Sequence, residues 1–184
     1  MDILTSILIG IGLAMDSSAV SMAGGIGRKA GLAKASLLAG LFFGGFQTGM
    51  FFIGGLGGES LKSMISGIDH WVAFLMLAFV GGKMLYESRH MEDKRVDLLD
   101  AKVLLFLALA TSIDALAVGV GVAFTDRSVF ESAIIVGITT ALISSASVFI
   151  GNRFGAVLEG KAEGFGGIVL VLIGMNILLS HVLG

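Results

Sequence analysis

Two aspartates, Asp16 and Asp114, interrupt stretches of sequence that are otherwise apolar enough for the interior of a membrane. Their surroundings are alike, because Asp16 lies in LAMDSSAV and Asp114 lies in SIDALAV. An ionised side chain at the centre of a bilayer costs about 2.5–3.5 kcal/mol on insertion scales, so intramembrane carboxylates are functional by default. We therefore interpret the two aspartates as a cation site in preference to a protonated, hydrogen-bonded structural pair.

A divalent cation explains how both aspartates could be ionised. Two carboxylates pressed together would share a proton, whereas a dication between them neutralises both. Small residues three, four or seven positions from each aspartate share its helix face, which lets another helix approach closely. These small residues are Gly12, Ala19 and Ala23 beside Asp16, and Ala110, Ala117 and Gly121 beside Asp114.

Further oxygen donors are predicted at membrane depth. They are Ser17, Ser21, Gln47, Thr48, Thr111, Ser112, Ser144, Ser145 and Asn176. For a single Ser or Thr, a hydrogen bond to its own helix is the simpler explanation, whereas a buried Gln or Asn is costlier to leave without a partner. Lys83 is explained by snorkelling to the interface, or serves as a counter-charge to an empty carboxylate site.

The donor types restrict the metal. The chain has no cysteine, which excludes disulfides and thiolate ligands. An all-oxygen site suits Mg²⁺, Ca²⁺ or Mn²⁺ better than Zn²⁺ or Cu⁺. No phosphate-binding G-x-x-x-x-G-K-[ST] motif is present, so the sequence contains no P-loop ATPase.

The elements that must position these residues are predicted to be transmembrane helices. Of the 184 residues, 55% are hydrophobic and only 14% are charged, and the mean hydropathy is +0.97. Soluble domains contain about 25% charged residues, and no basic stripe suggests nucleic acid. Because Asp2 stands where a signal peptide has basic residues, we expect the first apolar segment to be retained. Six segments are long enough to span a bilayer: 3–26, 35–56, 70–88, 101–125, 129–152 and 164–183.

The two halves of the chain resemble each other. The predicted organisation is a first three-helix repeat at 1–88, a charged cytoplasmic linker at 89–100 and a second three-helix repeat at 101–184. Matching residues are Asp16 and Asp114, whose numbers differ by 98; Gly40 and Gly137, and Gly54 and Gly151, whose numbers differ by 97; and Gly81 with Gly174 and Lys83 with Asn176.

The distribution of basic residues predicts the topology. The first, third and fifth loops contain Arg28, Lys29, Lys34, Arg89, Lys94, Arg95, Lys102, Arg153 and Lys161, whereas the second and fourth contain only Lys62 and Arg127. The positive-inside rule then places the odd-numbered loops in the cytoplasm and both termini outside. Because each repeat has three helices, an odd number, the second repeat has the opposite orientation in the membrane. Inverted repeats are a recurrent transporter architecture, with the binding site near the midplane.

Several motifs together resemble the prokaryotic manganese efflux pump family over essentially the whole chain. They are GLAMDSSAVSMAGG, GLFFGGFQTGM, HWVAFLMLAFVGGKMLYES, ATSIDALAVGVGVAF and KAEGFGGIVLVLIGMNILLSH. The resemblance implies a six-helix inner-membrane exporter of Mn²⁺, with Asp16 and Asp114 as key residues. Gln47 and Lys83 also match the family pattern. The chain lacks the proline that family members commonly have before Ile53-Gly54, so no proline kink is expected there.

Export of a dication needs an energy source. Moving two charges against an inside-negative potential of 100 mV costs roughly 4.6 kcal/mol. Without an ATPase motif, we expect a secondary-active transporter that works by alternating access and proton antiport, with no cofactor and with Mn²⁺ as substrate. The alternatives are an exporter of another divalent cation or small solute, a structural protein, and an intramembrane aspartyl protease. The protease is disfavoured because its Y-D, G-x-G-D and Pro-Ala-Leu motifs are missing.

Overall fold

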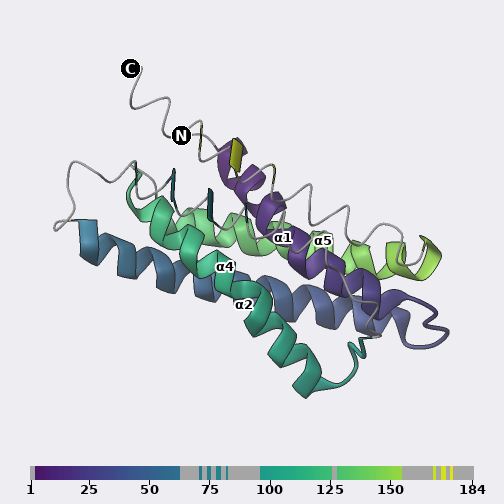
Figure 1. The fold of residues 1–184 in the computed structure, drawn as a ribbon. Helices are drawn as coiled ribbons and strands as arrows, with labels where there is room; N and C mark the ends of the chain where they lie inside the picture. Colours follow the sequence, from purple (N-terminus) through teal and green to yellow (C-terminus); the bar gives the residue numbers. More distant parts are fainter. Residues whose placement is uncertain are drawn as a thin grey trace.

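The protein is a helical membrane protein. The computed structural model describes residues 3–62, 71, 74–75, 78–79, 82, 96–125, 128–154, 168, 171–172 and 175. These residues contain four long helices, α1 (Ile3–Gly25), α2 (Leu32–Lys62), α4 (Ala101–Ala123) and α5 (Val129–Phe154), shown in Figure 1. Each of the four is long and apolar enough to cross a membrane.

The four helices agree with four of the six predicted segments. The prediction of segments 3–26, 101–125 and 129–152 is confirmed to within two residues at each end, and α2 is longer than the predicted 35–56 at both ends. The predicted segments 70–88 and 164–183 lie largely outside the described residues. Lys83 and Asn176 lie outside them as well.

Local sequence explains where the helices begin and end. The turn between α1 and α2 contains Gly27 and Gly31, whose φ angles of 64° and 70° suit glycine because it has no β-carbon. Asp100 caps α4, since its carboxylate accepts hydrogen bonds from the backbone N–H groups of Lys102 and Val103 at 2.8 and 3.4 Å. The turn and the cap thus fix how the chain enters α2 and α4.

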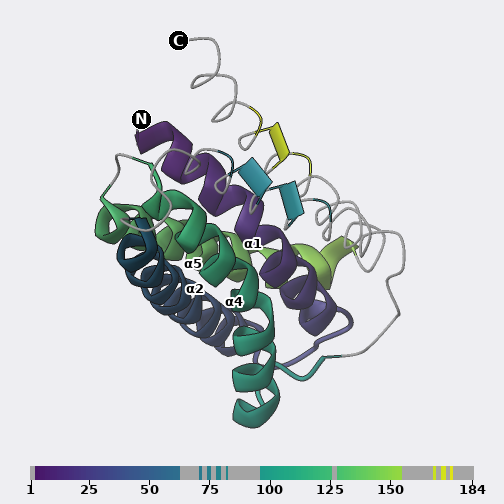
Figure 2. The same ribbon diagram turned by 60° about the vertical axis from the view of Figure 1, so that its left-hand side comes forward.

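Each helix packs chiefly against helices from the other half of the chain. In Figures 1 and 2, α2 (blue) and α5 (green) form a central pair, and α1 (purple) and α4 (teal) lie diagonally across them. The main contacts are those of α2 with α5, of α1 with α5 and of α4 with α2, while α1 and α2 barely touch. The two halves are therefore interlocked.

Small residues bring α2 and α5 together. A β-carbon added to Gly40 would meet Ser145, one added to Gly44 would meet Ala141, and one added to Gly137 would meet Thr48. Along these contacts the numbers in α2 rise as those in α5 fall, so the two helices are antiparallel. Close backbone approach at small residues is the usual way in which membrane helices associate, because hydrocarbon supplies no hydrophobic driving force between them.

Helices α1 and α5 are parallel to each other, and so are α2 and α4. Along α1 and α5, Ser6 hydrogen-bonds Ser132 and Ser18 hydrogen-bonds Ser147, so the numbers rise together. Along α2 and α4, a β-carbon on Gly54 would meet Leu116, and one on Gly58 would meet Val120 four residues further along. Since α2 and α5 are antiparallel, α1 and α4 also run in opposite directions.

The contacts between α1 and α5 recur between α4 and α2. Ser144 in α5 donates to Ser17 in α1, and Gln47 in α2 donates to the carbonyl of Thr111 in α4. Adding 94 to the number of Ser17 gives Thr111, and subtracting 97 from the number of Ser144 gives Gln47. The first contact therefore corresponds to the second. The shift of 97 equals the one read from the sequence for these helices.

The shift of 94 differs from the 98 that matches the two aspartates in sequence. By contact, the residue in α4 that corresponds to Asp16 is Ala110, and Asp114 lies four residues further along. Four residues are about one turn of an α-helix. The two aspartates therefore occupy positions one turn apart with respect to the surrounding contacts.

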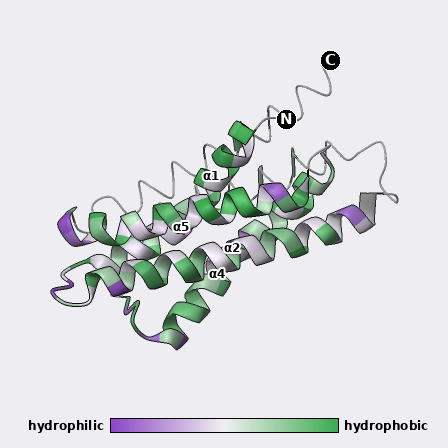
Figure 3. Ribbon diagram, turned by 180° about the vertical axis from the view of Figure 1, so that it is seen from behind, coloured by the Kyte–Doolittle hydropathy of each residue, from purple (hydrophilic) through white to green (hydrophobic). Residues whose placement is uncertain are grey.

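The outer faces of the helices are apolar. Figure 3 shows hydrophobic residues (green) along the helices and hydrophilic ones (purple) mainly towards their ends. Large apolar side chains are exposed there, including Leu41, Ile53, Phe106, Ile138 and Leu142. Apolar surface of this extent suits contact with lipid.

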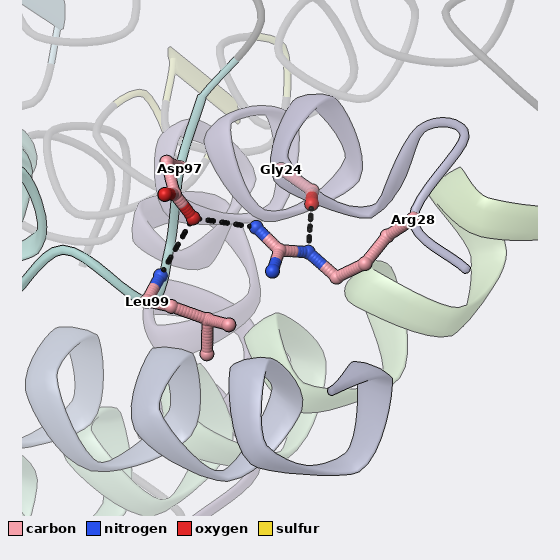
Figure 4. A network of polar contacts seen from close by, with 4 residues as sticks. All are labelled: Gly24, Arg28, Asp97 and Leu99. Carbon is pink, nitrogen blue, oxygen red and sulfur yellow. Dashed lines mark hydrogen bonds and ion pairs between the residues drawn. The ribbon is translucent and has the colours of Figure 1, made fainter. Parts of the chain in front are cut away.

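The loop after α1 meets the segment before α4 at one end of the bundle. Figure 4 shows Arg28 donating from Nε to the Gly24 carbonyl at 3.0 Å and from Nη2 to Asp97 Oδ1 at 2.8 Å. Asn152 near the end of α5 donates from Nδ2 to the carbonyls of Gly25 and Arg28, at 3.1 and 2.8 Å. Residues from the first, third and fifth connections, or next to them, thus gather at this end.

Replacing Arg28 with Gln is expected to raise the pKa of Asp97 towards its ordinary value of 3.8. The hydrogen bond from Arg28, followed by that from the Leu99 N–H, holds this pKa below 3.8. A lowered pKa means that the contribution of Asp97 to stability is complete above the pKa of the unfolded chain. It is lost as the pH falls through the lowered value.

A pH titration of the Asp97 carboxyl by NMR, in wild type and Arg28→Gln, measures the shift directly. Lys29→Gln is the matched control, because the hydrogen bonds that lower the Asp97 pKa come from Arg28 and Leu99 and not from Lys29. An unchanged Asp97 pKa in the variant would contradict the ion pair.

Candidate cation site

Asp16 and Asp114 occupy the same place in their helices. Each is the fourteenth residue of a helix of 23 residues. The side chain of Asp114 is 6% exposed and that of Asp16 is half-buried. Both carboxyl groups are therefore near the middle of an apolar helix and largely shielded from the outside.

The helix faces of the aspartates differ from those that contact the central pair. In α1, Gly10 and Ser17 face α5, while Asp16 shares its face with Gly12 and Ala19. Gly12 and Ala19 are buried, as expected for a close helix contact. In α4, Gly119 packs against α2, and Asp114 lies on a different face. The two aspartates are thus on helix faces other than those of Gly10, Ser17 and Gly119.

Gln47 connects the two helices that carry the aspartates. Its amide nitrogen donates to the carbonyl of Leu13 in α1 at 3.2 Å and to that of Thr111 in α4 at 3.3 Å. Leu13 is three residues before Asp16, and Thr111 is three residues before Asp114. A single fully buried side chain of α2 therefore touches the turn before each aspartate.

Helix geometry brings the carboxyl groups towards Gln47. Helical side chains point back over the turn that precedes them. Because α1 and α4 run in opposite directions, Asp16 and Asp114 lean towards the level of Gln47 from opposite sides. Gln47 thus marks a level that the turns before the two aspartates share.

The acceptor atom of Gln47 is left without a partner. Its nitrogen faces two carbonyls, and its Oε1 is buried with no hydrogen bond in the described part of the chain. Leaving a buried acceptor unsatisfied costs about 1–3 kcal/mol. The described residues contain no group of three or more His, Cys, Asp or Glu side chains that could hold a metal. A cation at this level would therefore need neutral oxygens such as Gln47 Oε1 in addition to carboxylates.

Most of the predicted hydroxyl donors bond to their own helix. The bonds run from Ser17 to the Ala14 carbonyl, Thr48 to Gly44, Thr111 to Ala108 and Ser112 to Leu109, with distances between 2.9 and 3.4 Å. Ser144 donates to Ser17 Oγ, and Ser145 donates to the Ser36 carbonyl. The simpler explanation, a bond to the residue's own helix, is thus confirmed for the first four hydroxyls, whereas Ser144 and Ser145 bond to other helices.

Two buried hydroxyls have no hydrogen-bond partner within the described residues. They belong to Ser21, one of the predicted donors, and to Thr140, which the sequence reasoning missed; both side chains are 0% exposed. No sequence signal distinguishes Thr140 from its neighbour Thr139, since only the packing of α5 decides which of the two is enclosed.

Long apolar helices with carboxyl groups at mid-helix, joined by a buried amide, define a multi-span helical membrane protein. Ionisable residues inside such spans mark ion or substrate pathways.

Comparison with known proteins then identifies the family. Residues 31–178 match the family described as "Putative manganese efflux pump", and the chain belongs to this family of transporters. Relatives named "Putative manganese efflux pump MntP" are 44% identical in Clostridium perfringens strain SM101, 45% in Gloeothece citriformis and 42% in Methanosarcina barkeri. These alignments cover 98%, 98% and 100% of this chain and 96%, 97% and 99% of the relatives. No solved structure matches the chain.

Proposed function

We propose that the protein exports Mn²⁺ from the cytoplasm through a site lined by Asp16 and Asp114. The observation that carries the proposal is the Gln47 amide, which bonds the turn before each aspartate. The relatives are named as manganese efflux pumps, which supports Mn²⁺ as the substrate. Hard oxygen donors without thiolates suit this ion.

The proposed ligands balance the charge of the ion. Two carboxylates neutralise one dication, and Gln47 Oε1 adds a neutral oxygen that has no hydrogen-bond partner among the described residues. Thr111 contributes through its carbonyl, which holds Gln47 in place. Ser17, Thr48, Ser112 and Ser144 support the helices by hydrogen bonds and need not contact the ion. Lys83 and Asn176 stay proposed as counter-charge and pathway residue.

Alternating access is proposed to follow from two inverted three-helix repeats. The antiparallel course of α1 and α4 and the recurrence of contacts at shifts of 94 and 97 support this arrangement. In such transporters one unit rocks against the other around a site near the midplane. Gln47 would then sit at the junction of the moving parts, because it bonds helices from both halves of the chain.

Proton antiport is proposed as the energy source. When the site faces outwards, Asp16 and Asp114 take up protons and release Mn²⁺; when it faces inwards, they lose the protons and bind Mn²⁺. Two protons for one dication make the exchange electroneutral, so the membrane potential does not oppose export. Without the proton exchange, moving the two charges of Mn²⁺ out of the cell would cost roughly 4.6 kcal/mol per 100 mV of membrane potential.

The proposed topology places both termini outside and the first, third and fifth loops in the cytoplasm. It is supported by the meeting of Arg28, Asp97 and Asn152 at one end of the bundle. The Mn²⁺ site would then be reached from the cytoplasm through that end.

Uptake of radioactive Mn²⁺ into inside-out membrane vesicles tests the proposed function. With an acidic interior, vesicles that contain the protein are expected to accumulate Mn²⁺, and a protonophore is expected to abolish accumulation. Excess Mg²⁺ should compete weakly, and Cd²⁺ and Fe²⁺ serve as further competitors for substrate choice. Accumulation that is unaffected by the protonophore would contradict proton antiport, and no accumulation above empty vesicles would contradict export.

A further inference from the structure

The contact between α1 and α5 carries hydroxyl groups along most of its length. Three pairs of serines hydrogen-bond across it: Ser6 with Ser132 at 3.3 Å, Ser17 with Ser144 at 3.0 Å, and Ser18 with Ser147 at 2.8 Å. We call this contact the serine seam. Between the first two pairs, Thr139 faces Gly10. Hydroxyl groups therefore follow α1 from near its first turn to beyond its middle.

The corresponding contact between α4 and α2 is different. Its glycine contacts, Gly54 with Leu116 and Gly119 with Phe51, have equivalents in the seam, but its side-chain hydroxyls, as far as the structure describes them, do not pair across the two helices. The positions that correspond to Ser144 and Ser147 are Gln47 and Met50, so the serine pairs of the seam do not recur there. Parallel packing of two helices in this protein thus does not require hydroxyls, and the serine seam needs another explanation.

Ser21 and Thr140, whose buried hydroxyls have no partner in the described part of the chain, both lie on the serine seam. Ser21 is one turn after Ser17, and Thr140 is one turn before Ser144, so each shares the face of a residue that bonds across the seam. A helical threonine usually donates to a carbonyl of its own helix, as Thr48 and Thr111 do here. Thr140 makes no such bond although it is fully enclosed.

The positions that correspond to these two residues by contact are apolar. Shifting Thr140 by 97 gives Phe43, and shifting Ser21 by 94 gives Ala115; both are 0% exposed. Apolar side chains therefore occupy the equivalent positions in the contact between α4 and α2. Each unsatisfied hydroxyl in the seam costs free energy that an apolar residue would avoid.

Water is the partner that fits these hydroxyls. Buried water molecules typically bond two to four polar groups that would otherwise be unsatisfied. The seam is too tight for a hydrated dication, because a β-carbon on Gly25 would already overlap the Val148 carbonyl and Ser18 lies 2.8 Å from Ser147. A water molecule is smaller, and the buried hydroxyls of Ser21 and Thr140 offer it hydrogen-bonding partners.

The serine seam joins an open end of the bundle to the level of Gln47. A pocket of about 210 Å³, lined by Ala23, Gly24, Ile26, Arg28, Val96 and Asp97, opens at the end where Arg28 pairs with Asp97. Ser21 is three residues from Gly24, less than one helical turn. Thr140 lies between the residues that face Gly10 and Ser17, beside the turn of Leu13 to which Gln47 bonds.

We propose that the serine seam holds a file of water molecules leading from the Arg28–Asp97 pocket to Gln47, and that this file conducts the protons exchanged for the exported cation. This inference rests on the proton antiport of the proposed function. It separates the routes of the two ions, since protons use the hydroxyl face of α1 and the dication uses the face that carries Asp16.

Single cysteines test whether water reaches the seam. The natural chain has no cysteine, so Ser21→Cys and Thr140→Cys each introduce one thiol. Ala115→Cys and Ala108→Cys are matched controls, because both are fully buried small residues on α4. We expect Ag⁺, which passes through narrow water files, to react with the two seam thiols at least about tenfold faster than with the controls. Equal rates would overturn the proposal.

Thr140→Val tests whether the file conducts protons. Valine keeps the shape and removes the hydroxyl. In proteoliposomes, the initial rate of Mn²⁺-driven proton movement is expected to fall about tenfold while the Kd of Mn²⁺ stays within twofold, and Thr140→Ser should restore the rate. Thr125→Val is the control, because the Thr125 hydroxyl bonds the Val122 carbonyl at the end of α4 and lies outside the seam. A wild-type rate in Thr140→Val would overturn this proposal alone, whereas absence of Mn²⁺-driven proton movement in the wild type would overturn the antiport as well.

Discussion

Asn in place of either Asp16 or Asp114 is expected to reduce Mn²⁺ export by at least about 100-fold. Asparagine keeps the shape and one oxygen but removes a negative charge, so a bound dication would keep a net positive charge in a low-dielectric site. At 4 Å and an effective dielectric constant near 20, two unit charges interact by about 4 kcal/mol. Loss of one such partner outweighs any single hydrogen bond in the protein.

The measurement is Mn²⁺ content and growth at raised Mn²⁺ in cells that carry each variant, followed by vesicle transport. Glu131→Gln is the matched control, because Glu131 is an exposed carboxylate in the first turn of α5. Its variant is expected to export at the wild-type rate. Wild-type Mn²⁺ tolerance in Asp16→Asn or in Asp114→Asn, at equal amounts of protein in the membrane, would refute the role of that aspartate.

Alanine at Gly54 or Gly119 is expected to destabilise the protein by about 3 kcal/mol. A β-carbon on Gly54 would overlap the carbonyl of Leu116, and one on Gly119 would overlap that of Phe51. Backbone atoms cannot rotate away as a side chain can, so α2 and α4 would have to separate. Their association depends on close van der Waals contact, which is lost steeply with separation.

Thermal unfolding of the purified protein in detergent measures this effect. Gly45→Ala and Gly49→Ala are controls in α2, because no atom lies within 4 Å of the added β-carbon at either position. Since alanine is the better helix former, these two are expected to raise stability by about 1 kcal/mol or less. Equal melting temperatures for Gly119→Ala and Gly49→Ala would argue against the packing of α2 on α4.

The sequence by itself determined which segments become spans. Apolar stretches of about 20 residues partition into hydrocarbon regardless of their neighbours, and in hydrocarbon a helix satisfies its own backbone groups. The ends of α1, α4 and α5 could therefore be predicted to within two residues. The same local reasoning singled out Asp16 and Asp114, because the cost of a charge in lipid is visible in the sequence. It also anticipated that Ser17, Thr48, Thr111 and Ser112 would bond to their own helices.

Only the tertiary structure decided which helices touch and in which register. The sequence motifs pair Asp16 with Asp114, whereas the contacts pair Asp16 with Ala110, one turn earlier. Short, repetitive runs of Ala, Ser and Gly match one another at several shifts, so sequence similarity does not fix the register to within a turn. The register is set where glycines let two backbones meet, and that depends on residues about 100 positions apart. For the same reason, the bridging role of Gln47 and the enclosed hydroxyl of Thr140 emerged only when α1, α2, α4 and α5 were packed together.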